Sequence, residues 1–102
     1  MTRKDALLLL NFANRMGMFI TPVRPSSKRF SEAAIVAFVH GYEIGRNGKC
    51  SFSRNLSMLL EQRHQFKVNA VGWPDQINRY SKRLGVRWDQ AFVDLTRQVA
   101  SA

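Results

Sequence analysis

Apolar residues recur along this chain at three- and four-residue spacings, in segments separated by Gly, Pro and Ser. The clearest example is the stripe Ala34, Ile35, Phe38, Val39 and Tyr42. Such spacing places side chains on one face of an α-helix, and no segment alternates with period two for long enough to predict a strand. We therefore predict an all-α fold, a single compact bundle of about five helices that forms one domain over residues 1–102.

The first predicted helix has clear start and stop signals. Thr2 with Asp5 three residues later approximates a capping box, which predicts a helix over about residues 3–16. Gly17 suits the left-handed position that ends such a helix. Residues 18–27 are expected to begin as a short extended piece and to continue as a loop, because two prolines block helix and sheet alike.

Ser, Gly and Pro residues also mark the predicted ends of the remaining helices. Ser31 is expected to cap a second helix that reaches about Ile44, and Gly41 within it suggests close approach by another helix or an early end. A third helix, capped by Ser51 or Ser53, should reach about residue 66. Two more should cover about residues 74–84 and 88–100, with Gly85 between them as a stop. The predicted inward-facing residues of these last three helices are Phe52, Leu56, Leu59, Leu60, Phe66, Ile77, Tyr80, Leu84, Trp88, Ala91, Phe92, Leu95 and Val99.

The charge of the chain limits its partners. There are 16 Lys+Arg against 7 Asp+Glu, a formal net charge of +9, which favours contact with nucleic acid, anionic lipid or an acidic protein face. The single Cys50 excludes an intramolecular disulfide and is predicted to be buried. No signal peptide opens the chain, and no stretch approaches the roughly 18 to 20 apolar residues of a membrane span. A cytoplasmic, soluble protein without a membrane partner is expected.

The titratable residues do not indicate catalysis. His40 and His64 are not at metal-ligand spacing, and no Asp or Glu completes a triad with them. We predict that His40 is partly buried against a backbone carbonyl and that His64 is exposed. Residues 45–49 lack the strand and the full spacing of a phosphate-binding loop. We therefore expect no enzyme activity, no cofactor, no metal and no small-molecule substrate.

Two groups of cations are candidates for partner binding. Arg79, Lys82 and Arg83 share a helix face and, with Arg87, predict a cationic ridge within nine residues. The other group is Arg24, Lys28 and Arg29, in the proline-containing loop, which would lose less entropy on binding than a flexible loop. In both groups, ordinary solvated surface charge is the simpler explanation.

The ridge also favours nucleic acid as an alternative partner. Residues 77–95 combine a short helix, a turn and a second amphipathic helix, as in a helix-turn-helix. However, Ser81 stands where a small apolar residue is usual, and Asp89 and Asp94 on the second helix would face phosphates unfavourably. A small basic DNA- or RNA-binding regulator therefore stays the second hypothesis.

The order of several short motifs resembles a group of small helical bacterial proteins. Asn14-Arg15-Met16-Gly17-Met18-Phe19-Ile20 is similar to an Arg-Pro-Gly-Met-Tyr-aliphatic-Gly stretch near the start of that group, although Met16 replaces the usual Pro and Thr21 the Gly. A Phe-x-x-Gly-Tyr pattern follows at residues 38–42, then Gly72-Trp73, then Phe92-Val93-Asp94-Leu95. Together these pieces span most of the chain in the same order.

Proteins of that group resemble immunity proteins, which are encoded beside polymorphic or contact-dependent toxins and bind one cognate toxin. The resemblance implies a non-enzymatic inhibitor, with buried aromatics such as Phe38, Tyr42 and Trp73 as scaffold and exposed arginines as contacts. Given the positive charge, the cognate toxin should present an acidic contact face, or the contact should avoid the nucleic-acid cleft of the toxin. Arginine suits this role because its planar fork pairs bidentately with carboxylates.

Overall fold

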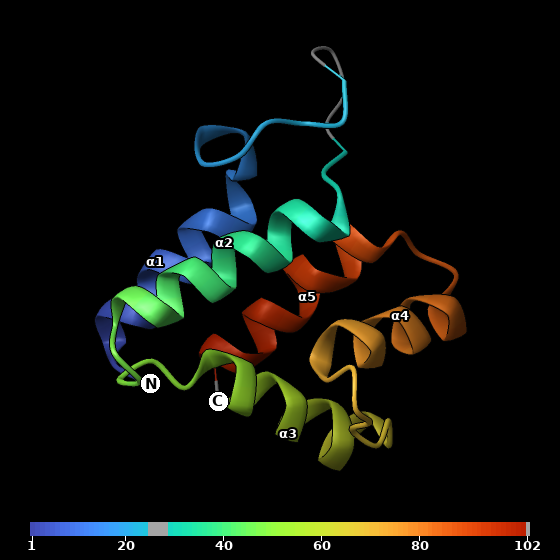
Figure 1. Cartoon of the computed structure of the whole chain (residues 1–102). Coiled ribbons are helices and arrows are strands. Elements are labelled where there is room, and N and C mark those ends of the chain that lie inside the picture. The colour runs from blue at the N-terminus through green and yellow to red at the C-terminus, as the bar shows by residue number, and fades with distance from the viewer. Residues whose placement is uncertain (25–28, 102) are drawn as a thin grey trace.

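Five α-helices make up most of the chain (Figure 1). The computed structural model describes residues 1–24 and 29–101. The helices are α1 (Arg3–Asn14), α2 (Glu32–Gly45), α3 (Phe52–His64), α4 (Trp73–Leu84) and α5 (Trp88–Ser101), and a short 3-10 helix, η1 (Met16–Met18), follows α1. No strand occurs in these described ranges, so the predicted all-α bundle of about five helices is confirmed.

Helix α5 is the centre of the bundle and packs against α1, α2, α3 and α4 (Figure 1). Its Ala91, Phe92, Leu95 and Val99 are buried, as their spacing predicted. The Phe92 ring stacks on Trp88 with ring centroids 5.9 Å apart, and Phe12 and Phe52 meet it edge to face. Aromatic contacts of this kind add to the stabilisation that burial of apolar area supplies.

Helix α1 begins as predicted but ends earlier. Both hydrogen bonds of the Thr2–Asp5 capping box are present. The helix stops at Asn14, and Gly17 does not adopt the left-handed conformation expected of it. Instead, the Arg15 N–H bonds to the last carbonyls of α1, and η1 continues the turn. The expected extended piece is also wrong, because the amides of residues 19 and 20 both donate to the Met16 carbonyl at 2.9 Å.

Helix α2 begins after Ser31, whose hydroxyl accepts from the Ala34 N–H at 3.1 Å, as predicted. Both explanations offered for Gly41 are wrong. The helix continues to Gly45, and a Cβ built at Gly41 would meet no atom within 4 Å. Gly41 lies on an exposed face, so neither packing nor termination requires a glycine at this position.

Helix α3 ends at His64 rather than near Phe66, because Gln65 adopts a left-handed conformation with φ 62°. Ser51 occupies the N-cap position without a side-chain capping bond. The Ser53 side chain and N–H both bond to the Glu43 carboxylate, which joins the start of α3 to α2. Phe66 is nevertheless buried, as predicted.

Helix α4 starts at Trp73, with Pro74 in its first turn, and Gly85 ends it in a left-handed conformation, as predicted. Ile77 and Tyr80 are buried, whereas Leu84 is 55% exposed and was wrongly assigned to the core. Leu84 is the last residue of the helix, where Gly85 already turns the chain toward α5, so its side chain does not reach the interior.

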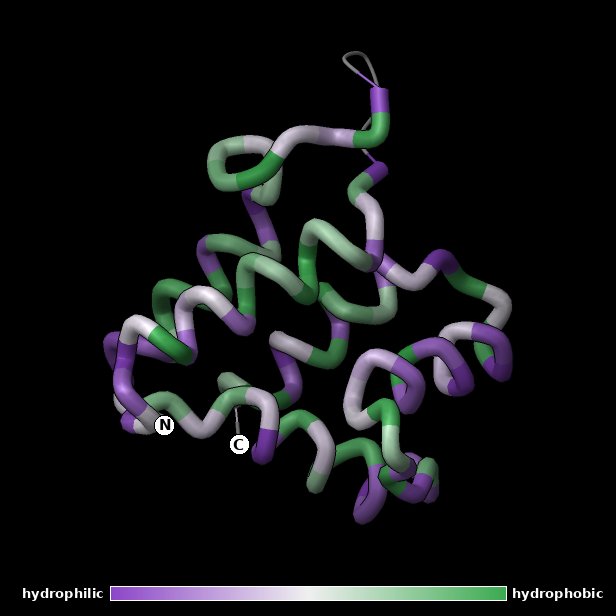
Figure 2. The backbone as a smooth tube through the Cα atoms, viewed as in Figure 1, coloured by the Kyte–Doolittle hydropathy of each residue, from purple (hydrophilic) through white to green (hydrophobic). Residues whose placement is uncertain are grey.

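Polar and apolar residues alternate along the helices with the helical period (Figure 2). Cys50 is buried, as predicted, and burial raises the pKa of its thiol. Within residues 1–24 and 29–101, no helix has both the length and the apolar character needed to cross a membrane.

Candidate partner-binding surface

Two of the predicted ridge arginines fold back against the segment between α3 and α4. Arg79 pairs with Asp75 at 3.0 Å and donates to the Lys67 carbonyl at 2.6 Å. The Arg83 guanidinium lies 4.1 Å from the Phe66 ring centroid and donates to the His64 carbonyl at 3.3 Å. Both arginines therefore hold this segment in place while their charge stays at the surface.

Gln76 anchors the same segment from below, and sequence reasoning missed it. Its fully buried amide donates to the carbonyls of Phe66 at 2.7 Å and Ser57 at 3.2 Å, and accepts from the Ser57 hydroxyl at 2.6 Å. Its helical spacing from Trp73 and Tyr80 placed it on the buried face of α4. A polar residue at an inward position is the signal that could have identified it.

Lys82 differs from its two neighbours. It is exposed, and no hydrogen bond or ion pair engages its ammonium in the part of the chain that the structure describes. The exposed Lys67 lies next to Arg79, since the Lys67 carbonyl accepts a hydrogen bond from the Arg79 guanidinium. We call Lys67, Arg79, Lys82 and Arg83 the α4 basic surface. The structure thus supports a cationic cluster at three of the four predicted ridge positions.

The fourth predicted residue, Arg87, lies apart from this surface. It pairs with Asp89 at 3.1 Å, and Asp89 also accepts from the Phe30 N–H at 3.3 Å. Arg87 is thereby joined to the residues that precede α2. Because Gly85 reverses the chain after α4, helical spacing does not extend the ridge as far as Arg87.

The proline-containing loop is described in part. Arg24 and Arg29 are both exposed, and the Arg29 carbonyl accepts from the Val23 N–H at 2.9 Å. Lys28, the third predicted contact of this loop, lies outside the described residues. Phe30, which follows Arg29 in the chain, is joined to Arg87 through the Asp89 carboxylate.

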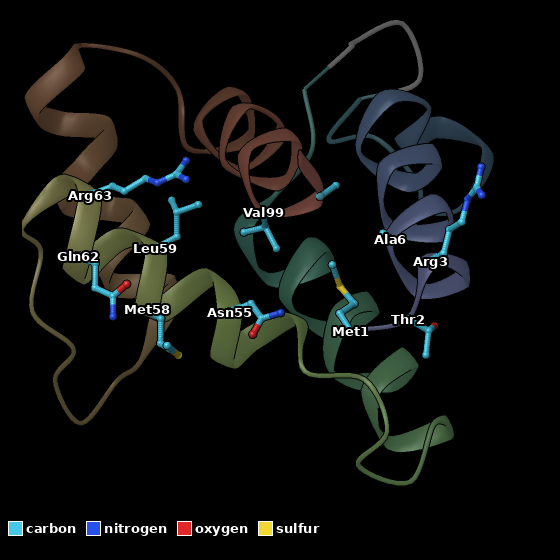
Figure 3. Close-up of a pocket in the computed structure, with 11 residues that line it drawn as sticks. Met1, Thr2, Arg3, Ala6, Asn55, Met58, Leu59, Gln62, Arg63 and Val99 are labelled. Carbon is cyan, nitrogen blue, oxygen red and sulfur yellow. The ribbon is translucent and has the colours of Figure 1, made fainter. Parts of the chain in front are cut away.

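Two hollows lie at opposite ends of the antiparallel helices α1 and α5. The first, of about 560 Å³, lies where the start of α1 meets α3 and the end of α5 (Figure 3). The second, of about 580 Å³, lies where the end of α1 meets the start of α5. The residues lining the first hollow are Met1, Thr2, Arg3, Ala6, Asn55, Met58, Leu59, Gln62, Arg63, Val99 and Ala100.

The buried carboxylate of Asp5, in the first turn of α1, is fully engaged. Its oxygens accept hydrogen bonds from Thr2, from the Tyr42 hydroxyl and from Arg46 Nε at 2.9 Å. Burial alone would raise the pKa of Asp5, but the hydrogen bonds from Tyr42, Thr2 and Arg46 outweigh it and lower that pKa to about 2. Burial and the same carboxylate raise the pKa of Tyr42 to about 12.

Most carboxylates of the chain are hydrogen-bonded to other groups of the fold. Five of the seven Asp and Glu residues accept hydrogen bonds from protein groups: Asp5, Glu43, Asp75, Asp89 and Asp94. By contrast, every described Lys and Arg except Arg46 and Arg79 is exposed. The fold therefore presents a surface that is more one-sidedly cationic than the composition alone indicates.

The exposure of both histidines differs from the prediction. His40 is exposed rather than partly buried, and its ring meets the edge of Trp73 at 6.1 Å. His64 is half-buried rather than exposed: its Nε2 lies 2.9 Å from the Gln98 side-chain oxygen, and its ring contacts Tyr80. Among the described residues, no three His, Cys, Asp or Glu side chains are grouped so that they could hold a metal ion.

Comparison of the chain with models of known protein families, with curated proteins and with solved structures finds no match.

Proposed function

We propose that this chain is a non-enzymatic immunity protein that binds and neutralises a cognate bacterial toxin through an acidic face of that toxin. The observation that carries the proposal is the separation of charge: five of the seven carboxylates accept hydrogen bonds from other groups of the fold, whereas most of the described cations are exposed. An acidic partner is then attracted from a distance and meets few repulsive groups on contact.

The way the α4 basic surface is built supports the same role. Arg79 and Arg83 are held by backbone carbonyls and by the Phe66 ring, so little side-chain entropy remains to be lost on binding. An inhibitor needs such a rigid contact surface and needs no catalytic group. The motif order of the chain, which resembles immunity proteins, supports the proposal independently.

The helix-turn-helix alternative has less support. A recognition helix must present one side to the major groove, and its reading residues must be polar. Helix α5 would take that role, but it packs against all four other helices. Its exposed positions include the carboxylate of Asp94, which Tyr80 and Gln98 hold in place, and Gln90, Arg97 and Ser101.

The test is rescue from the product of the neighbouring gene. The C-terminal domain encoded next to this chain is expressed in a bacterial host with and without it, and growth and complex formation on a sizing column are measured. We expect growth arrest by the domain alone and rescue by a one-to-one complex. A neighbouring product that is not toxic, or a toxin that this chain does not bind, would contradict the proposal.

A charge-reversed pair of variants locates the contact. Lys82→Glu is expected to weaken toxin binding by at least about tenfold, because it places a carboxylate opposite the acidic face. Lys49→Glu, an exposed lysine between α2 and α3, makes the same change in net charge and should weaken binding far less. In parallel, binding of a 20-base-pair duplex and of a single strand is measured at physiological salt. Submicromolar affinity that falls steeply with added salt would favour the nucleic-acid alternative.

A further inference from the structure

We propose that the first hollow is a docking groove for an acidic amphipathic helix of a partner protein. The inference deepens the proposed function, because it names the part of the acidic partner that is recognised and adds a second contact to the α4 basic surface. It rests on three features of the hollow: a helix face with exposed side chains, unengaged polar groups, and a lining without carboxylates.

One wall of the groove is a face of α3 on which Met58, Gln62 and Arg63 are exposed. The residues of α3 that line it recur at helical spacings: Asn55, Met58, Leu59, Gln62 and Arg63. Helices α1 and α3 both pack against α5, and Figure 3 shows Val99 of α5 between them at the base of the groove. The groove therefore occupies the place that one further helix of the bundle would take.

Thr2 in the groove lining bonds to Asp5, but the other four polar side chains of the groove have no partners within the described fold. In the described part of the chain, no hydrogen bond or ion pair engages the side chains of Arg3, Asn55, Gln62 or Arg63. Arg3 projects from α1 and Arg63 from α3, on opposite sides of the groove (Figure 3). A ligand with carboxylates on both flanks would meet one guanidinium on each side, and each guanidinium can pair bidentately.

Between these polar side chains, the lining of the groove is apolar and adaptable. Met58 is 44% exposed, and Leu59, Val99 and Ala6 complete an apolar lining. Methionine is unbranched and polarizable, so it adjusts to ligand side chains of different shape. A hollow of about 560 Å³ takes only a few side chains, such as those along one face of a short helix.

The groove chemistry favours a helix over other acidic ligands. An extended peptide adds to a sheet edge, and the described chain has no strand. A nucleic acid would require a row of cations along its backbone, whereas only two arginines flank this apolar base. An amphipathic helix uses the whole surface: apolar side chains against Met58 and Val99, and flanking carboxylates toward the arginines.

The first experiment uses a defined probe. A 16-residue helix-forming peptide carries Leu at positions i, i+3, i+4 and i+7 and Glu on both flanks, and its control is a scrambled peptide of the same composition. Each is titrated into the isotope-labelled full chain and followed by NMR. We expect saturable shifts confined to the groove residues, and binding at least about tenfold weaker for the scrambled peptide. Equal binding of both peptides, or shifts outside the groove, would overturn the inference.

A matched pair of variants isolates the groove from general electrostatics. Arg63→Glu and Arg54→Glu make the same change in charge at two exposed positions of α3, but only Arg63 lines the groove. Arg63→Glu should weaken peptide binding by at least about tenfold, and Arg54→Glu by no more than about twofold. Met58→Glu should abolish peptide binding, because it places a carboxylate in the apolar base of the groove. Equal effects of the two arginine variants would contradict a groove. Binding of decanoate at these residues without peptide binding would identify a lipid site and also overturn it.

The same variants separate this inference from the proposed function. If the chain neutralises the neighbouring toxin, yet Arg63→Glu binds that toxin normally and the peptide does not compete, the groove is wrong and the immunity function stands. If the peptide binds in the groove while the neighbouring product is neither toxic nor bound, the immunity function is wrong and the groove stands.

Discussion

The two hollows of this protein have nearly the same size and similar residues, but the second contains a carboxylate that engages its neighbours and the first contains none. Each contains exposed arginine and an amide side chain. In the second hollow, Asp89 binds Arg87 and the Phe30 N–H, and Asn14 accepts from Arg97 at 2.8 Å. In the first, Arg3 and Arg63 lie beside no carboxylate in the lining.

The difference shows how to separate structural charge from charge available to a partner. A guanidinium that is paired with a carboxylate and joined to backbone contributes to folding, and mutating it disturbs the chain that it holds. An unengaged guanidinium at the rim of an apolar hollow contributes little to folding. Stability measurements at the two ends of α1 and α5 therefore test which hollow is structural and which is free to bind.

The largest effect is expected at Asp89. Asp89→Ala removes the acceptor for Arg87 and for the Phe30 N–H and removes a negative charge from the first turn of α5. We expect a loss of about 3 kcal/mol in the free energy of unfolding, measured by urea denaturation. Arg63→Ala, in the other hollow, should change it by less than about 0.5 kcal/mol. A comparable loss in both variants would abolish the distinction between the hollows.

The second prediction concerns the loss of stability in acid that protonation of the buried Asp5 carboxylate should cause. The folded-state pKa of Asp5, about 2, lies below its ordinary value of about 3.9, so the carboxylate stabilises the fold above pH 4. That stabilisation, about 2 kcal/mol, is lost as the pH falls from about 4 to about 2. Urea denaturation across this range should show the loss, and Tyr42→Phe should reduce it because one hydrogen bond to Asp5 disappears. An Asp5 carboxyl carbon that titrates near pH 4 by NMR would contradict this account.

A smaller difference is expected between neighbouring cations of α4. Arg83→Ala removes the contact with the Phe66 ring and the bond to the His64 carbonyl, at a cost of about 1 kcal/mol. Lys82→Ala should have no measurable effect, because Lys82 has no such contact in the described structure. Thermal unfolding of the two variants side by side distinguishes them. An equal loss of stability in the two variants would mean that the contacts of Arg83 contribute no more to folding than the side chain of Lys82 does.

The helices could be predicted from the sequence because each is encoded locally. The Thr2 and Ser31 caps, the stop at Gly85 and the apolar face of α5 all depend on residues within a few positions of one another. The 3-10 turn after α1 was missed because its backbone bonds follow no residue preference. The exposure of Leu84 was missed because helical spacing does not say where a neighbouring helix ends.

The candidate site was less predictable because it depends on contacts between distant segments. The ridge residues were identified by their spacing. In the structure, Arg83 lies against Phe66, whereas Arg87 is linked through Asp89 to Phe30. Both sets of contacts join residues that are far apart in the chain. The first hollow was missed altogether. Its α3 wall has a helical pattern in the sequence, but nothing in that pattern distinguishes Arg63 from the other polar residues of the helix. The position of α1, which forms the opposite wall, follows from the tertiary packing.

The smallest effect is expected at Gly17, in the lining of the second hollow. A Cβ at this position would meet the Phe30 ring at 3.7 Å, an ordinary van der Waals distance, and the backbone does not require a glycine. Gly17→Ala should therefore stabilise the protein by about 0.5 kcal/mol, because it reduces the freedom of the unfolded chain and adds contact with Phe30. Urea denaturation measures the change, with Gly85→Ala as a destabilising control at a left-handed position. A loss of stability in Gly17→Ala would show that the added Cβ clashes with the Phe30 ring, so that the second hollow is packed more tightly than this contact distance indicates.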